Sequence, residues 1–207
     1  MPKKHRSHRK PRPEKRGFAF GRAWQKVRVA LLSAFAWTKT FVRQNPTAVR
    51  SGAIFAGCML AFLLAYDRIA SSQAMDAIRI VVTKATAAFL NLFGYHVTSE
   101  DTLISSSKFQ MGIVTGCTAL IPIAIFIAAV LAYPCRIRDK VLGILFGIVT
   151  ISAVNLVRTV TLFFIGTSFP GFFETAHFLI WQSLVIVISI GLWLLWAQKL
   201  VRVPAKQ

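Results

Sequence analysis

Hydrophobic residues along this chain gather into four long runs, and short polar or charged segments separate them. The runs cover about residues 51–66, 113–135, 141–165 and 175–198. A helix crosses a bilayer with about 17 to 25 apolar residues, and flanking charged side chains can extend a slightly short run. The pattern therefore predicts four transmembrane helices.

Two further segments have the mixed pattern of helices that lie in a membrane surface. Residues 18–45 alternate aromatic and aliphatic side chains with Arg and Lys, and Asn45-Pro46 ends the segment. Residues 74–93 repeat apolar positions at helical spacing, and Gly94 is placed as a C-cap. Beyond them, apolar side chains between Val97 and Ile113 alternate with Ser, Thr and Glu, which predicts a short extracytoplasmic hairpin.

The positive charge of the chain belongs to one segment. The net charge is +18, yet 14 of the 25 Lys and Arg residues lie within the first 50 positions. Residues 1–17 hold almost nothing apolar, so we expect a disordered basic cytoplasmic tail that is attracted to anionic lipids. No aromatic side chain is interleaved with these charges to stack on bases, and we expect no nucleic-acid partner.

The charges of the loops predict the orientation of the chain. The connector 134–140 and the tail 199–207 are rich in Lys and Arg, whereas the loop 166–174 has neither. Basic loops stay in the cytoplasm, so both termini are expected inside a bacterial inner membrane and the loop 166–174 outside.

The overall composition agrees with an all-α integral membrane protein. The chain is 55% hydrophobic and 15% charged, which excludes an ordinary soluble domain. Its three cysteines form an odd, widely spaced set, which argues against a disulfide framework or a zinc site. We expect no metal and no organic cofactor. The predicted membrane domain spans residues 50–198.

Three chemically reactive side chains fall at one predicted depth. Cys117 lies at the outer start of the second span, Arg158 within roughly two turns of the outer end of the third, and His177 in the first turn of the fourth. Taken singly, each has an ordinary explanation as a packing or helix-end residue. A buried Arg is costly in a membrane and marks function unless it is neutralised, and three such side chains would not share one depth without a reason.

Cysteine-based acyl transfer requires this set of groups. Cys117 would be the nucleophile, His177 the general acid and base, and Arg158 the group that stabilises the oxyanion or orients the substrate carbonyl. Asn155 lies one turn from Arg158 and is a supporting residue. Glu174 is a weaker candidate for orienting His177, Trp181 is expected in the pocket wall, and His96 competes with His177 for the acid and base role.

Three short motifs resemble the exosortase and archaeosortase family, and the compact exosortase H type most closely. They are Gly116-Cys117-Thr118, Asn155-Leu156-Val157-Arg158, and the segment from Glu174 to Gln182. The resemblance covers roughly residues 50 to 198. Many larger exosortases follow the cysteine with Ser-Gly-Leu-Arg, whereas this chain has Thr118-Ala119-Leu120-Ile121.

The resemblance implies a membrane cysteine transpeptidase of Gram-negative bacteria with Cys117, Arg158 and His177 as its catalytic residues. Its substrates would be proteins with a C-terminal sorting signal, which combines a short motif containing proline and tryptophan, one transmembrane helix and a basic cluster. An acceptor amine, a lipid head group or water would resolve the thioester. Two alternatives remain at this point: a noncatalytic membrane scaffold or assembly factor, and a membrane thiol oxidoreductase.

Overall fold

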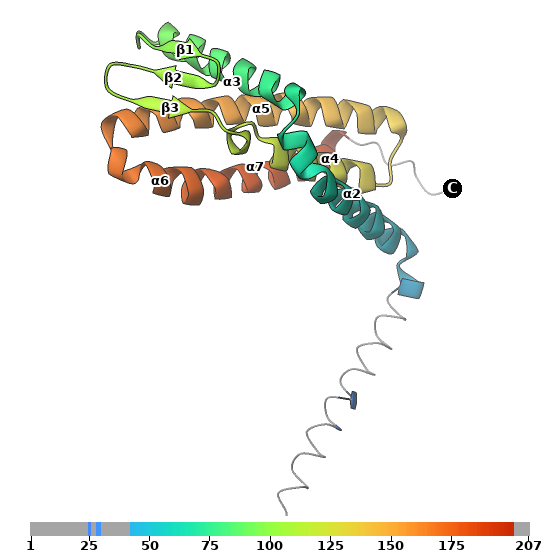
Figure 1. Cartoon of the computed structure of the whole chain (residues 1–207). Helices are drawn as coiled ribbons and strands as arrows, with labels where there is room; N and C mark the ends of the chain where they lie inside the picture. Colours follow the sequence, from blue (N-terminus) through green and yellow to red (C-terminus); the bar gives the residue numbers. More distant parts are fainter. Residues whose placement is uncertain (1–24, 26–27, 30–41, 201–207) are drawn as a thin grey trace, which may run out of the picture. The chain divides into compact units, whose positions relative to one another are not determined.

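The computed structural model of the chain describes residues 25, 28–29 and 42–200 (Figure 1). The basic tail predicted over 1–17, most of the surface helix predicted over 18–45, and residues 201–207 lie outside the described residues. The chain divides into two compact units, Met1–Pro46 and Thr47–Gln207. The elements described below belong to the second unit, except that the first helix begins at Pro46.

The second unit is dominated by helices. Its α-helices are α2 (Pro46–Ala70), α3 (Gln73–Leu92), α4 (Leu120–Ala132), α5 (Ile137–Ser168), α6 (Phe173–Thr175) and α7 (Gln182–Leu195). A 3₁₀ turn at Pro170–Phe172 precedes α6, and π-helical turns at Ala176–Trp181 and Trp196–Leu200 flank α7, so the last helical stretch is nearly continuous. In the described part of the chain three stretches are long and apolar enough to cross a membrane: Pro46–Ala70, Ile137–Ser168 and Pro170–Lys199. The prediction of a helical membrane protein is confirmed.

The second predicted span is shorter than the run 113–135 suggested. Its helix α4 has 13 residues and a length of about 20 Å, against a hydrocarbon core of about 30 Å. At its start, Ile113 donates a backbone hydrogen bond to the Thr102 carbonyl and so continues a sheet. At its end, Tyr133 is extended because it precedes Pro134, and a residue before proline avoids the helical region. Neither of these two limits on the length of α4 can be predicted from hydropathy alone.

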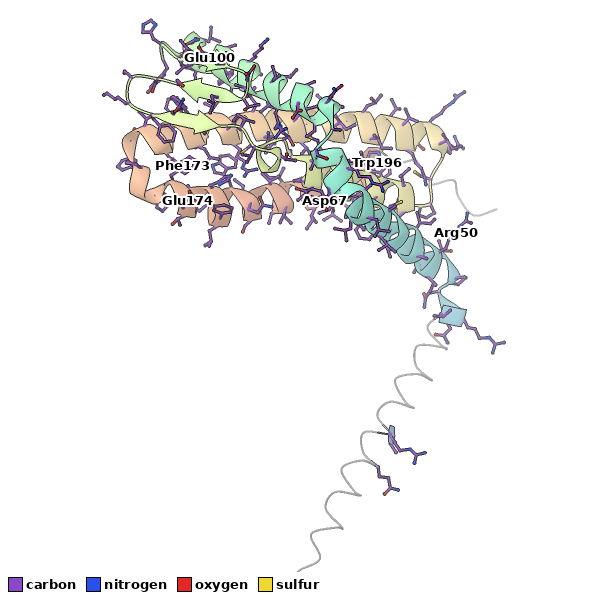
Figure 2. All side chains as sticks on the ribbon, in the orientation of Figure 1. Arg50, Asp67, Glu100, Phe173, Glu174 and Trp196 are labelled. Atoms are coloured by element: carbon purple, nitrogen blue, oxygen red, sulfur yellow. The ribbon has the colours of Figure 1, made fainter. Side chains whose placement is uncertain are left out.

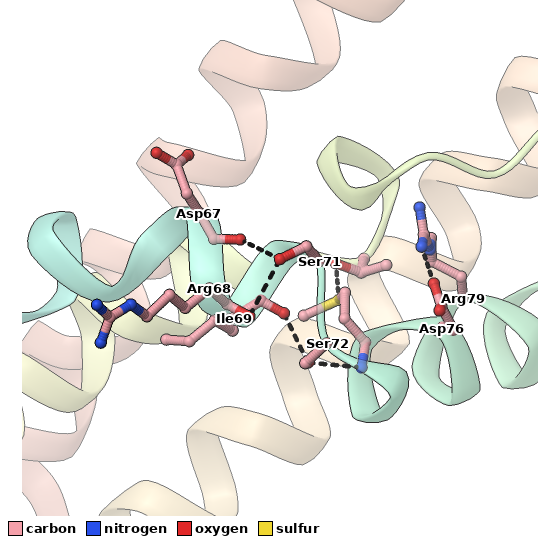
Figure 3. Close-up of polar contacts among 9 residues, drawn as sticks. Asp67, Arg68, Ile69, Ser71, Ser72, Asp76 and Arg79 are labelled. Carbon is pink, nitrogen blue, oxygen red and sulfur yellow. Dashed lines mark hydrogen bonds and ion pairs between the residues drawn. The ribbon is translucent and has the colours of Figure 1, made fainter.

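The surface helix predicted over 74–93 is α3, and a short polar turn connects it to α2 (Figure 3). Ser72 is the N-cap, and its side-chain oxygen accepts a hydrogen bond from the Met75 backbone N–H at 3.2 Å. Asp76 and Arg79 form an ion pair one turn further on. Gly94, with a φ of 83°, follows the helix in the left-handed conformation, as the sequence predicted.

A three-stranded antiparallel sheet follows α3, one strand more than the predicted hairpin. Its strands are β1 (Thr98–Glu100), β2 (Leu103–Ser105) and β3 (Gln110–Gly112), in the order β1-β2-β3. Asp101 has a positive φ in the two-residue turn between β1 and β2, a conformation that aspartate tolerates. The sheet places Ile104 and Met111 opposite each other, both buried.

Helix α5 lies between α3 with the sheet on one side and the last helical stretch on the other (Figure 1). Figure 2 shows Phe173 and Glu174 at one end of that last stretch and Trp196 toward the other. Two hydrophobic cores form along α5. The first joins α3, the sheet and the C-terminal half of α5, and it includes Cys117; the second joins α4 to Trp196 and includes Ala119. The segment between Cys117 and Ala119 therefore connects the two cores.

Candidate active site

Cys117 lies on a sharp turn between the sheet and α4. It is the last residue of a 3₁₀ turn, Thr115–Cys117, and its backbone N–H donates to the Val114 carbonyl at 2.8 Å. Ala119, two residues later, has a φ of 56°, a left-handed conformation that is uncommon for a residue with a side chain. Such backbone strain is concentrated at functional sites in proteins. The Cys117 side chain is buried, with 6% exposed.

Two side chains of α5 bind the backbone of this turn. Asn155 Nδ2 donates to the Cys117 carbonyl at 2.6 Å, and Arg158 Nη1 donates to the Gly116 carbonyl at 3.2 Å. Both side chains are nearly fully buried, with 2% and 3% exposed. They lie one turn apart on the same face of α5, as their spacing predicted. The position of the cysteine thus depends on two polar groups of another helix.

His177 reaches the same turn from the last helical stretch. Its Nε2 atom lies 3.9 Å from Cys117 Sγ. The histidine belongs to the π-helical turn Ala176–Trp181, and π turns inside helices are frequent at functional sites. Phe173 stacks on the imidazole with ring centroids 5.9 Å apart, and Phe178 packs against it at 4.6 Å. These aromatic contacts restrict the orientation of the ring.

The Arg158 guanidinium has no acidic partner in the described part of the chain. The ion pair found there joins Arg79 and Asp76 on α3. Arg158 Nε is buried and makes no hydrogen bond within the described residues. A buried guanidinium without a counter-charge is destabilising, so this site favours a negative charge beside it.

The other predicted residues take less direct positions. Trp181 is half-buried and packs against the first core, and its place in a pocket wall stays a prediction. Glu174 is exposed, and in the described residues it makes no hydrogen bond or ion pair with His177. His96 is exposed in the loop that follows α3 and makes no contact with Cys117 among the hydrogen bonds of the described residues.

The sequence analysis assigned no role to several residues of the site. Thr118 is buried and donates to the Thr115 carbonyl at 2.7 Å, which stabilises the turn around Cys117. Phe173 and Phe178 hold the histidine ring. Phe173 lies four residues before His177, and side chains at i and i+4 share one helix face, so the contact between them could have been predicted from the sequence. Phe178 directly follows His177, and this spacing predicts no contact. No comparable signal pointed to the Gly116 carbonyl, which is an ordinary backbone group.

Cys58 and Cys135 make no described contact with Cys117, Arg158 or His177. All three cysteines are free, and Cys58 and Cys135 are half-buried. Cys135 lies in the connector between α4 and α5, where burial raises the pKa of its thiol above the ordinary value. In the part of the chain that the structure describes, no three His, Cys, Asp or Glu side chains gather as a metal site.

The fold and the site together define a membrane protein with several helices able to span a bilayer and a buried Cys–His pair supported by Arg and Asn. Residues 30–197 match the family of transmembrane exosortases (Exosortase_EpsH), and the chain belongs to this family. The matched region begins 20 residues before the region that the sequence motifs covered. No curated protein and no solved structure matches the chain. Family membership identifies the general class as membrane-embedded sorting proteases and transpeptidases.

Proposed function

We propose that this protein is a cysteine transpeptidase or protease that cleaves proteins carrying a C-terminal sorting signal through a thioester intermediate. The observation that supports it most is the 3.9 Å approach of Cys117 Sγ and His177 Nε2 from different elements. A nucleophile and a base within reach of each other are required for covalent acyl transfer, and such contacts are often long in the absence of substrate.

The proposed reaction begins with transfer of the thiol proton from Cys117 to His177 Nε2. The thiolate then attacks the carbonyl carbon of the scissile peptide, and a C–S bond forms as the carbonyl oxygen becomes an oxyanion. When the C–N bond breaks, the protonated His177 gives its proton to the leaving amine, and a thioester remains on Cys117. An acceptor amine, a lipid head group or water then attacks the thioester and regenerates the thiol.

Arg158 is proposed to stabilise the negative charge of this reaction. One guanidinium N–H is used on the Gly116 carbonyl, and a guanidinium has five N–H donors in all. The remaining donors are suited to the thiolate or to the oxyanion of the substrate, because the buried cation has no acidic partner among the described residues. The N-terminus of α4, which starts at Leu120, also favours negative charge near Cys117.

The proposed location is a bacterial inner membrane with both termini in the cytoplasm and the site near the outer face. The basic connector between α4 and α5 supports a cytoplasmic position, and the loop between α5 and α6 contains no Lys or Arg. Cys117, Arg158 and His177 lie toward the end of the molecule that carries this uncharged loop.

The two alternatives fit the geometry less well. A thiol oxidoreductase needs a second thiol near Cys117, but α4 separates Cys117 from Cys135 by about 20 Å of helix. A noncatalytic scaffold does not require a buried arginine beside a cysteine and a histidine. Loss of cleavage in Cys117→Ala would exclude a noncatalytic scaffold.

The decisive experiment is to trap a substrate fragment on Cys117. The purified full-length protein is incubated with a reporter that ends in a proline- and tryptophan-containing motif, one apolar helix and a basic cluster. Mass spectrometry is expected to find the reporter fragment attached to Cys117 as a thioester. Cys117→Ala is expected to abolish cleavage at normal protein abundance, whereas Cys58→Ala and Cys135→Ala retain it. Normal cleavage by Cys117→Ala would show that the proposed function is wrong.

A further inference from the structure

An apolar groove opens between α3, α4 and α5 and ends beside the candidate site. It has a volume of about 690 Å³. Ile78 and Val81 of α3, Ile123 of α4, and Ile148 and Ser152 of α5 line it. Thr118, the neighbour of Cys117, and Asn155 form its inner end. The groove therefore leads from the surface of the helices to Thr118, the residue that follows Cys117.

One polar atom at the inner end of the groove has no partner. The amide nitrogen of Asn155 donates to the Cys117 carbonyl, and because a carbonyl only accepts, this contact determines which way the amide points. Asn155 Oδ1 is left buried, without a hydrogen bond in the described residues. An unpaired buried acceptor is unfavourable, so the site calls for an occupant that brings an N–H or O–H donor.

The walls of the groove contain small residues where a helix would lie. Ala77 and Ala85 of α3 and Ser152 and Ala153 of α5 line it, and all four are exposed. Small side chains allow helix backbones to approach closely in membranes. An acyl chain could fill the apolar walls, but it has no donor for Asn155 Oδ1.

From the groove and its unpaired acceptor we propose that it binds the apolar helix of a sorting signal, with the N-terminal end of that helix at Asn155. The inference rests on the proposed function. A helix N-terminus has backbone N–H groups without intrahelical partners, and Asn155 Oδ1 accepts one of them. The segment that precedes the bound helix then lies beside Thr118 and Cys117, where cleavage is proposed to occur.

Val81 and Val187 provide a matched pair for testing the groove. Both are valines with 64% of the side chain exposed, but Val81 lines the groove, whereas Val187 on α7 does not. A photo-crosslinking amino acid is placed at each position in the full-length Cys117→Ala protein, together with the sorting-signal reporter in membranes. Crosslinking to the apolar helix of the reporter is expected from position 81, at least about tenfold above position 187.

A kinetic test separates binding from chemistry. In the otherwise unaltered protein, Val81→Trp is expected to raise KM for the reporter by about tenfold with little change in kcat, because the indole fills the groove and leaves the cysteine turn intact. Val187→Trp is expected to leave both constants unchanged. Protein abundance and melting temperature are measured for both variants, so that misfolding is recognised.

The outcomes distinguish the two proposals. If Cys117→Ala abolishes cleavage while position 81 crosslinks only to lipid, or no more to the reporter than position 187 does, the groove assignment is wrong and the proposed function stands. If Cys117→Ala cleaves normally, the proposed function fails, and the groove inference that rests on it fails as well. Equal kinetics for Val81→Trp and Val187→Trp with well-folded proteins would also overturn the groove assignment.

Discussion

At the scale of single residues, the site is built by side chains that hold a backbone. Arg158 and Asn155 donate hydrogen bonds to the backbone carbonyls of Gly116 and Cys117 and not to the Cys117 sulfur. His177 approaches the sulfur from another helix, and Phe173 and Phe178 restrict its ring. Precise placement of reacting groups accounts for a large part of enzymatic rate enhancement, so these contacts are expected to matter as much as the reactive groups themselves.

The shape of the Arg158 side chain is predicted to be essential as well as its charge. Lysine keeps the positive charge but lacks the planar fork that can bind the Gly116 carbonyl and an oxyanion together. Arg158→Lys is therefore expected to lower kcat for reporter cleavage by about 100-fold or more, the scale seen when an oxyanion donor is removed. Arg79→Lys, at the ion pair on α3, is the control and should retain cleavage. Equal activity of the two variants would contradict the role of Arg158.

The backbone conformation at Ala119 gives a second prediction. Its φ of 56° is unfavourable for residues with a side chain by roughly 1 to 2 kcal/mol, and glycine adopts it freely. We expect Ala119→Gly to retain reporter cleavage with unchanged or higher thermal stability. Ala119→Val, with a branched side chain at a buried position, is expected to lower both. A valine variant as stable and active as the glycine variant would show that this conformation is not required.

At the scale of elements, α5 is the helix that organises the packing. Added Cβ atoms at three of its glycines would overlap aromatic rings: Gly143 with Trp196, Gly147 with Phe126 and Gly166 with Phe109. The close approach of these rings brings α4, the last helical stretch and the sheet onto one helix. Phe109 also packs on Phe163 and Phe173, so the sheet is tied to the segment that carries His177.

The close packing at Gly147 is predicted to be sensitive to a single methyl group. An added Cβ would overlap the ring of Phe126, and Phe126 is almost fully buried, with 2% exposed. Gly147→Ala is expected to destabilise the protein by about 1 to 3 kcal/mol, as overpacked cores do. The measurement is the melting temperature in detergent. Gly191→Ala is the control, since nothing lies within 4 Å of its added Cβ, and it should be neutral or slightly stabilising. Equal stability of both variants would contradict this packing.

At the scale of the whole second unit, the site lies where two parts of different character meet. Helix α5 has 32 residues and a length of about 48 Å, well beyond a hydrocarbon core of about 30 Å. Its C-terminal half packs against α3 and the sheet in the first core, and its N-terminal half packs against α4 and Trp196. A buried hydrogen bond of 2.9 Å between Thr86 and Thr159 joins α3 to α5. The site therefore has the short helix α4 on one side, and α3 with the three-stranded sheet on the other.

The proposed orientation predicts opposite accessibility for two exposed positions. Lys108 lies between β2 and β3, and Arg138 lies at the start of α5. Each is changed to cysteine in a protein that also carries Cys58→Ala, Cys117→Ala and Cys135→Ala. In spheroplasts, a membrane-impermeant maleimide is expected to label Lys108→Cys directly and Arg138→Cys only after the membrane is permeabilised. The reverse pattern would overturn the proposed orientation.

The sequence by itself determined the helical membrane class and named the candidate residues of the site. Hydropathy and charge are local properties, so the long spans around α2, α5 and α7 and the end of α3 at Gly94 could be read without a fold. The prediction that Cys117, Arg158 and His177 share one depth followed from helical rise along single segments. Their catalytic roles remain a prediction.

Only the tertiary structure decided how these side chains meet. The short length of α4 depends on the hydrogen bond from the Ile113 N–H to the carbonyl of Thr102 in the turn between β1 and β2, a contact between segments that no periodicity encodes. The third strand, the π turn at His177 and the hydrogen bonds of Arg158 and Asn155 to backbone carbonyls likewise depend on neighbours distant along the chain. Backbone carbonyls are identical at every residue, so a sequence can name the donors of such bonds but cannot say which carbonyl will accept them.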